Sequence, residues 1–105
     1  MNSEIREIST EQIIRAIKSM CVESNTILGD DVIRAIQRAH DKEESQVGQD
    51  ILNQFLENAR ISREEGIPLC QDTGLAVVFV TLGQDVHLVG GSLTEAVNEG
   101  VRQGY

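Results

Sequence analysis

The sequence predicts an α+β (or α/β) fold, with N-terminal helices followed by a β-hairpin-like pair of strands and one more helix. Apolar residues recur at helical spacing up to about residue 65, and two apolar runs of strand length lie after Pro68. A capped helical pattern then closes the chain. We therefore expect a helical part over residues 1–65, and a loop, two strands and a helix over residues 66–105.

Length and composition indicate one small globular domain that works in a reducing compartment. The chain has 105 residues, a hydrophobic fraction of 40% and a formal net charge of −8. This acidic balance argues against nucleic acid and anionic membrane surfaces as partners, because both bind clustered Lys and Arg. The two cysteines make no disulfide framework, no apolar run approaches the roughly 20 residues of a membrane span, and the N-terminus lacks a signal-peptide pattern. These features predict a cytoplasmic protein.

The first helix is predicted from about residue 10 to residue 24. Ser9 and Gln12 have the spacing of a capping box, in which each side chain bonds to the backbone N–H of the other residue. The apolar residues that follow at helical spacing are Ile13, Ile14, Ile17, Met20 and Cys21. Since Cys21 lies on this stripe, we expect it to be a buried core thiol.

Two further helices are predicted before residue 66. Asp30 is placed to cap a helix whose apolar stripe ends at His40, where a histidine interacts favourably with the helix dipole. We prefer this structural interpretation of His40 to a catalytic one. A third helix is expected from about residue 45 to residue 65, where Gly66 ends it and Pro68 prevents its continuation.

The second part of the chain predicts two strands. The run from Leu75 to Leu82 is apolar at almost every position, as in a strand that is buried on both faces. Residues 83–85 form a turn pattern, and residues 86–89 predict a second strand that would pair with the first as a hairpin. His87 belongs to this second strand and could lie on either of its faces.

The last helix is predicted over about residues 92–104 and follows Gly90 and Gly91. Ser92 and Glu95 have the spacing of a second capping box. A diglycine before a helix is also compatible with an anion site, because helix N-termini present free N–H groups. We prefer the capping interpretation, since Ser92 and Glu95 already satisfy some of these donors.

We expect the chain to be the front part of a longer polypeptide. Two strands make a poor independent sheet, and a strand that is apolar on both faces needs cover from both sides. The chain also stops at Tyr105, directly after its last helix.

The stretch C-Q-D-T-G, residues 70–74, concentrates polar side chains where the helical part meets the apolar run. The positions after Cys70 do not fit a phosphatase loop or a dithiol motif, and the chain has no paired-cysteine zinc spacing. Local chemistry leaves a metal ligand and a structural cysteine equally open for Cys70. Asp72 is either a turn cap or a member of a proton-transfer pair. Gln71 is suited to binding a substrate carboxylate through its amide.

With these motifs in order, the chain resembles class I fumarate hydratase and the related L-tartrate dehydratase α-subunit. The similarity is carried by G-I-P-L-C-Q-D-T-G, the apolar run, G-Q-D-V, and G-G-S-L-T-E-A-V-N-E-G-V-R-Q-G-Y. It covers about residues 10–105 and is most specific over residues 66–105.

This resemblance implies a hydro-lyase that reversibly adds or removes water on a small dicarboxylic acid, with fumarate/L-malate first and L-tartrate/oxaloacetate next. In the family a 4Fe–4S cluster is held by three cysteines, and its open iron binds substrate as a Lewis acid. The resemblance makes Cys70 one cluster ligand and Gln71 a substrate-carboxylate contact. Asp72 then lies at the substrate and assists proton transfer.

The resemblance also implies partners that complete the site. The other two cluster cysteines lie further along in the family, and Cys21 matches neither of them. We therefore expect the remainder of the catalytic chain, a β-subunit or both to contribute, in a dimer or an α2β2 assembly. By itself the 105-residue chain should hold no stable cluster and should be inactive.

Two other classes of function compete with this interpretation. The first is a non-catalytic truncated scaffold or subunit-assembly module, which a genuine stop codon after Tyr105 would favour. The second is a thiol enzyme that uses Cys70 together with His87.

Overall fold

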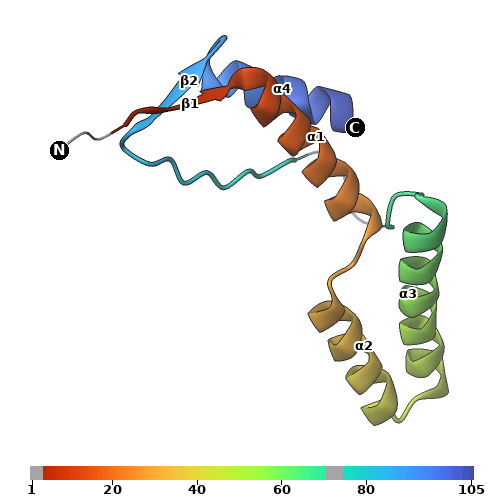
Figure 1. Ribbon diagram of the computed structural model, residues 1–105. Helices are drawn as coiled ribbons and strands as arrows, with labels where there is room; N and C mark the ends of the chain where they lie inside the picture. The colour runs from red at the N-terminus through yellow and green to blue at the C-terminus, as the bar shows by residue number, and fades with distance from the viewer. Residues whose placement is uncertain (1–3, 71–74) are drawn as a thin grey trace. The chain divides into compact units, whose positions relative to one another are not determined.

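The computed structural model describes residues 4–70 and 75–105, and its elements confirm the α+β class (Figure 1). In chain order they are β1 (Arg6–Ser9), α1 (Thr10–Thr26), α2 (Asp30–Lys42), α3 (Gln46–Glu65), β2 (Val86–Val89) and α4 (Leu93–Gly104). All the predicted helices are present, with small shifts at their ends. The chain divides into two compact units, one of residues 1–22 with 73–105 and the other of residues 23–72.

The sheet of the first unit differs from the predicted hairpin. β2 is present as predicted, but it pairs in parallel with β1, with Arg6 opposite Val86 and Ile8 opposite Leu88. Ile8 of β1 and its partner Leu88 of β2 are both half-buried, as is Val86 of β2. The sequence does not predict β1, because R-E-I-S is short, carries two charges and has one apolar residue.

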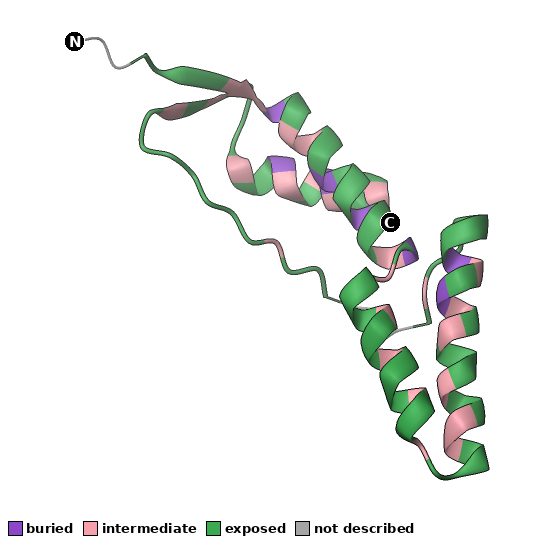
Figure 2. Cartoon of the chain, turned by 60° about the horizontal axis from the view of Figure 1, so that its bottom comes forward, coloured by how far each residue is buried: buried purple, intermediate pink, exposed green. Residues whose placement is uncertain are grey.

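The apolar run of residues 75–82 is not a strand in the structure, which corrects the prediction of a first hairpin strand there. Most of the run is exposed, with Leu75 at 85% and Phe79 at 93% exposure (Figure 2). The run lacks a neighbouring strand among the described residues because β2 pairs with β1 instead. Without such a neighbour, its composition alone does not build a sheet.

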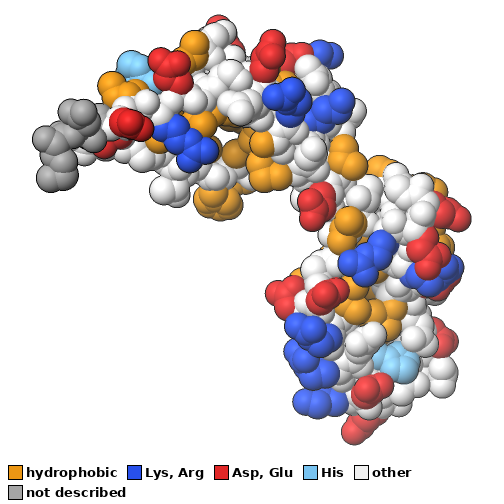
Figure 3. Space-filling model, in the orientation of Figure 1, with side chains coloured by type: hydrophobic (Ala, Val, Ile, Leu, Met, Phe, Trp, Pro, Cys, Tyr) orange, Lys and Arg blue, Asp and Glu red, His pale blue; other side chains and the backbone are white. Residues whose placement is uncertain are grey.

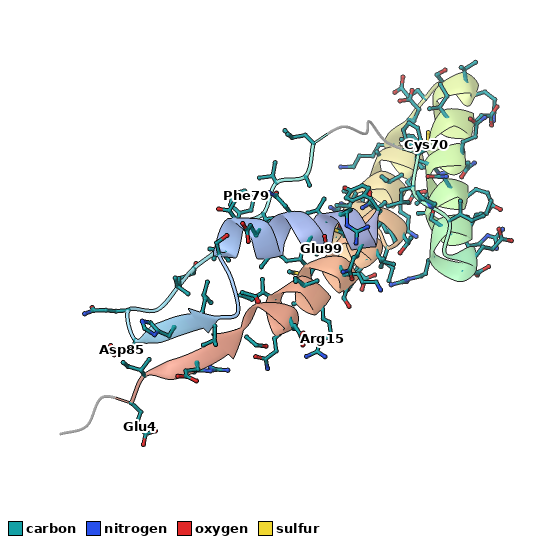
Figure 4. All side chains as sticks on the ribbon, turned by 90° about the horizontal axis from the view of Figure 1, so that it is seen from above. Glu4, Arg15, Cys70, Phe79, Asp85 and Glu99 are labelled. Carbon is teal, nitrogen blue, oxygen red and sulfur yellow. The ribbon has the colours of Figure 1, made fainter. Side chains whose placement is uncertain are left out.

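Helices α1 and α4 lie side by side because glycines of α4 face α1 (Figures 1 and 4). A Cβ on Gly100 would lie 2.5 Å from the Cβ of Ile17, and one on Gly104 would lie 2.6 Å from the Cβ of Cys21. Only glycine fits at such distances. Ile17 and Cys21 are buried at this contact, which confirms the predicted core position of Cys21.

Serine caps begin both helices of this unit, as predicted. The Gln12 N–H donates to Ser9 Oγ at 3.3 Å, and the Ser9 N–H donates to Gln12 Oε1 at 3.1 Å. In α4 the Glu95 N–H donates to Ser92 Oγ at 3.1 Å. These bonds satisfy N–H groups that have no partner inside the helix.

The diglycine before α4 has a conformational explanation. Gly90 and Gly91 have φ angles of 105° and 156°, in the region that favours glycine. A Cβ on Gly90 would also lie 2.8 Å from Thr10 Oγ1. Backbone shape and close packing therefore account for this pair, in agreement with the capping interpretation.

In the second unit, α2 and α3 form a helical hairpin joined by residues 43–45. The Oγ of Ser45 caps α3 by accepting the Gly48 N–H at 3.3 Å. The predicted cap of α2 by Asp30 is wrong, because Gly29 occupies the N-cap and Asp30 is the first helical residue. There its negative charge still interacts favourably with the positive end of the helix dipole.

Helix α2 is amphipathic. Its basic residues Arg34, Arg38 and Lys42 follow one another every four residues, and Lys and Arg side chains gather along α2 in Figure 3. His40 lies in the last turn, as predicted, with its Nδ1 3.3 Å from Asp41 Oδ1. Over the described residues, no helix is both long enough and apolar enough to cross a membrane.

Candidate functional site

The candidate site centres on Cys70, and the end of α3 sets the path of the chain toward it. Gly66 ends α3 in the left-handed conformation, with φ 67° and ψ 27°, as its predicted role requires. The Gly66 N–H donates to the Ser62 carbonyl oxygen at 2.9 Å. Pro68 cannot continue the helix, so the chain turns away from the axis of α3.

Two backbone hydrogen bonds then hold the residues that lead into the motif. The Leu69 N–H donates to the Asn25 carbonyl oxygen at 2.6 Å. The Cys70 N–H donates to the side-chain Oδ1 of Asn58 at 3.1 Å. Asn25 belongs to the last turn of α1 and Asn58 to α3, and both residues lie in the second unit, where they fix the approach to Cys70.

A mostly apolar pocket of about 490 Å³ borders Cys70. Its apolar lining is Leu28, Val32, Ile36, Phe55 and Leu69, and its polar lining is Gln54, Asn58 and Cys70. Cys70 itself is exposed and carries a free thiol (Figure 4). An exposed thiol on an anchored backbone can ligate a metal or react with a partner, which favours a chemical over a structural role for Cys70.

The other residues of the predicted site, Gln71 and Asp72, lie outside the described residues, as do Thr73 and Gly74. Their assigned roles at the substrate therefore stay predictions. Their distance from Cys70 along the chain is one and two peptide bonds. The hydrogen bonds at Leu69 and Cys70 fix the first residue of the motif and the residue before it.

The two histidines lie on elements other than the loop of Cys70. His87 lies on the exposed face of β2, in the first unit, whereas Cys70 belongs to the second. His40 lies near the end of α2 beside Asp41. The pairing of Cys70 with His87 stays a prediction.

The residues present fit one part of an iron–sulfur site. Over the described ranges, no group of three His, Cys, Asp or Glu side chains is placed to hold a metal ion. Cys70 is exposed and suits a single ligand position, whereas Cys21 is buried against α4 and does not. A three-cysteine site would thus need ligands beyond the two cysteines of this sequence.

Two exposed helix pairs hold carboxylates in their charged form. A hydrogen bond from Arg60 lowers the pKa of Glu57. Hydrogen bonds from Arg102 and then Gln103 lower the pKa of Glu99 to about 2. Both carboxylates are therefore ionised near neutral pH and are poor proton donors, so neither is a candidate general acid.

Asn58 is a site residue that the sequence reading missed. It is a half-buried polar residue of α3, next to the buried Ala59 and one turn before the buried Ser62. A polar amide at such a position needs a partner, and this is the signal that could have revealed it. The partner, the Cys70 N–H, is twelve residues away in the chain and thus invisible to a local pattern.

Comparison with known proteins gives one family match and several relatives. The family model described as fumarate hydratase (Fumerase) matches residues 14–105. "Putative L(+)-tartrate dehydratase subunit alpha" of Methanocaldococcus jannaschii is 34% identical over 82 residues, which cover 77% of this chain and 29% of that protein. No solved structure gives a significant match.

Two Escherichia coli K12 proteins are also similar. "Fumarate hydratase class I, anaerobic" is 38% identical over 66 residues, covering 63% of this chain and 12% of that protein. "L(+)-tartrate dehydratase subunit alpha" is 26% identical over 102 residues, covering 94% of this chain and 34% of that protein. The chain therefore spans about a third or less of each of these relatives.

Proposed function

The chain belongs to the fumarate hydratase family, and we propose that it is the N-terminal part of a hydro-lyase that adds or removes water on a small dicarboxylic acid. The observation that carries the proposal is the family match over residues 14–105, which contain Cys70 and the C-Q-D-T-G motif. The substrates we propose are fumarate and L-malate first, and L-tartrate and oxaloacetate next. Relatives that carry the names of both activities support both pairs of candidates.

The cofactor we propose is a 4Fe–4S cluster with Cys70 as one of its thiolate ligands. When bound, such a cluster supplies a Lewis-acidic iron that binds the substrate's oxygen atoms and stabilises developing negative charge. Within this chain, Cys70 contributes a ligand on a backbone held by Asn58. Gln71 binds a substrate carboxylate, and Asp72 assists proton transfer by polarising the base or relaying the proton to it.

The partner we propose is the polypeptide that supplies the other two ligands, either the remainder of the same chain or a β-subunit. The relatives named as α-subunits support a second subunit, and the chain spans only 29% and 34% of two of them. The exposed run of residues 75–82 gives independent support, since a partner that adds strands would cover it. We call this chain together with that polypeptide the complete enzyme, and we propose a dimer or an α2β2 assembly for it.

The residues around the run also line an apolar pocket that a partner could fill. An apolar pocket of about 290 Å³ lies in the first unit, where Val80 and Leu82 face Ile8, Ile17 and Val97. The apolar side chains that line such a pocket lack packing contacts on one side, and a partner could supply them. The runner-up function, a non-catalytic assembly module, uses the same surface but needs no cluster.

The experiment is an activity assay of the complete enzyme, co-produced, purified without oxygen and reconstituted with iron and sulfide. We expect hydration of fumarate to malate, or dehydration of tartrate to oxaloacetate, and no turnover by the 105-residue chain alone. A complete enzyme that carries a full cluster but turns over none of these acids would overturn the hydro-lyase proposal. An assembly that forms without binding iron would favour the assembly module.

A further inference from the structure

We propose that Asn58 is the positioning residue for Cys70, an inference that rests on the proposed function of Cys70 as a cluster ligand. Asn58 accepts the Cys70 N–H through its Oδ1 at 3.1 Å, across twelve residues of sequence. This side chain therefore ties the backbone of the ligand residue directly to helix α3.

The two residues joined by this bond lie in different kinds of backbone, a helix and a loop. Asn58 lies seven residues before the end of a 20-residue helix, where the backbone is held by its own ladder of hydrogen bonds. Cys70 lies in a loop. A second backbone hydrogen bond holds the preceding residue of this loop, because the Leu69 N–H donates to the Asn25 carbonyl oxygen at 2.6 Å. The Asn58 side chain thus restricts the position of Cys70, the residue that would bear the thiolate, relative to α3.

The surroundings of the bond are partly apolar. Asn58 is half-buried and borders the same apolar pocket as Cys70, beside Phe55 and Leu69. The bond itself is exposed, so we expect it to contribute as much as an ordinary hydrogen bond. If the oxygen were removed, the Cys70 N–H would lose its protein partner beside apolar side chains.

The chemical consequence is control over where the Cys70 sulfur lies. A cluster ligand has to be held within about 0.5 Å of its bonding position by residues behind it. The residue that follows the anchor directly is Gln71, so the same bond limits where the substrate-facing part of the motif starts. Asn58 touches no reacting atom in this account and acts through Cys70.

The test compares three variants of α3. Asn58→Ala removes the acceptor oxygen, Asn58→Asp keeps an oxygen at the same position, and Asn53→Ala changes an exposed asparagine of the same helix. In this chain we expect the amide hydrogen of Cys70 to exchange about threefold to tenfold faster in Asn58→Ala, as expected for loss of one hydrogen bond. The other two variants should exchange close to the unchanged chain.

The second readout is the cluster of the complete enzyme, measured by electron paramagnetic resonance after reduction with dithionite and by the rate of cluster loss in air. Asn58→Ala should broaden the signal and speed the loss, and Asn58→Asp should restore both toward the unchanged enzyme. Unchanged Cys70 amide exchange in Asn58→Ala would overturn the inference, as would an unchanged cluster signal and loss rate. If Asn58→Ala unfolds the chain, an Asn58→Asp variant with fast Cys70 exchange would overturn it equally.

The two proposals fail in distinguishable ways. If replacing Cys70 itself leaves the cluster intact, the ligand assignment fails whatever Asn58 does. If replacing Cys70 removes the cluster while Asn58→Ala leaves amide exchange and cluster signal unchanged, the function stands and the positioning role of Asn58 falls.

Discussion

At the scale of single residues, Gly100 shows how one side-chain position decides a helix contact. A Cβ there would lie 2.5 Å from the Cβ of Ile17 and 3.0 Å from the Ile14 carbonyl oxygen. The carbonyl is backbone and Ile17 is buried, so neither can move aside at small cost. Glycine at this point is therefore a packing requirement between α1 and α4.

We predict that Gly100→Ala lowers the free energy of unfolding of this chain by about 1–2 kcal/mol, because overpacking outweighs the better helix propensity of alanine. Urea unfolding followed by circular dichroism measures the difference. The matched control is Asn98→Ala, an exposed position of the same helix, which should stay within about 0.5 kcal/mol of the unchanged chain. A Gly100→Ala chain as stable as the control would show that α4 does not pack on α1 in this way.

At the scale of elements, the apolar run of residues 75–82 is the part whose sequence and structure disagree most. Its composition is that of a strand covered on both faces, yet Phe79 is 93% exposed. A strand forms when neighbours supply both hydrogen bonds and cover, and these neighbours are absent among the described residues. We propose that this run is the surface that a partner polypeptide would cover.

We predict that Phe79→Glu leaves the stability of this chain within about 0.5 kcal/mol, since the ring is exposed, but weakens assembly of the complete enzyme. A carboxylate buried without a partner in the assembled interface is costly, so the dissociation constant should rise at least about tenfold. Analytical ultracentrifugation of the two polypeptides measures it. Gln84→Glu adds the same charge at the exposed turn and should assemble normally. Equal assembly by both variants would remove the run from the interface.

At the scale of elements, the sequence was sufficient to predict the helices but not the pairing of the strands. Local signals were sufficient for the helices, because Ser9 with Gln12, Ser92 with Glu95, and Gly66 act within one turn of their helix ends. Strand pairing was not predictable, since β1 joins β2 across almost the whole chain. The cap of α2 was misassigned by one residue because Asp30 and Gly29 are neighbours that both suit a helix start.

The same division holds for the candidate site. Cys70 could be singled out from its motif, and its role as a cluster ligand stays a prediction. Asn58 could not, because its partner is twelve residues away and depends on the turn made by Gly66 and Pro68. Side chains that hold a site in place are fixed by tertiary contacts and leave little trace in a local pattern.

At the scale of the whole molecule, the chain has the features of one contributor to a shared site. It offers one exposed cysteine on an anchored loop, a second cysteine buried in a helix contact, and an uncovered apolar run. A cluster held by three cysteines cannot be completed from these residues. The central claim is therefore that Cys70 ligates a cluster whose other ligands the partner polypeptide supplies.

The measurement that tests this claim most directly is the iron content of the complete enzyme with Cys70→Ser, and its electron paramagnetic resonance signal after reduction with dithionite, beside a Cys21→Ala control. We predict that Cys70→Ser loses the stable cluster together with hydration activity, because one of the three ligands is gone. Cys21→Ala should keep the cluster and lose only stability, since Cys21 is buried where α1 and α4 meet. A Cys70→Ser enzyme that retains full iron content and the unchanged signal would contradict the account.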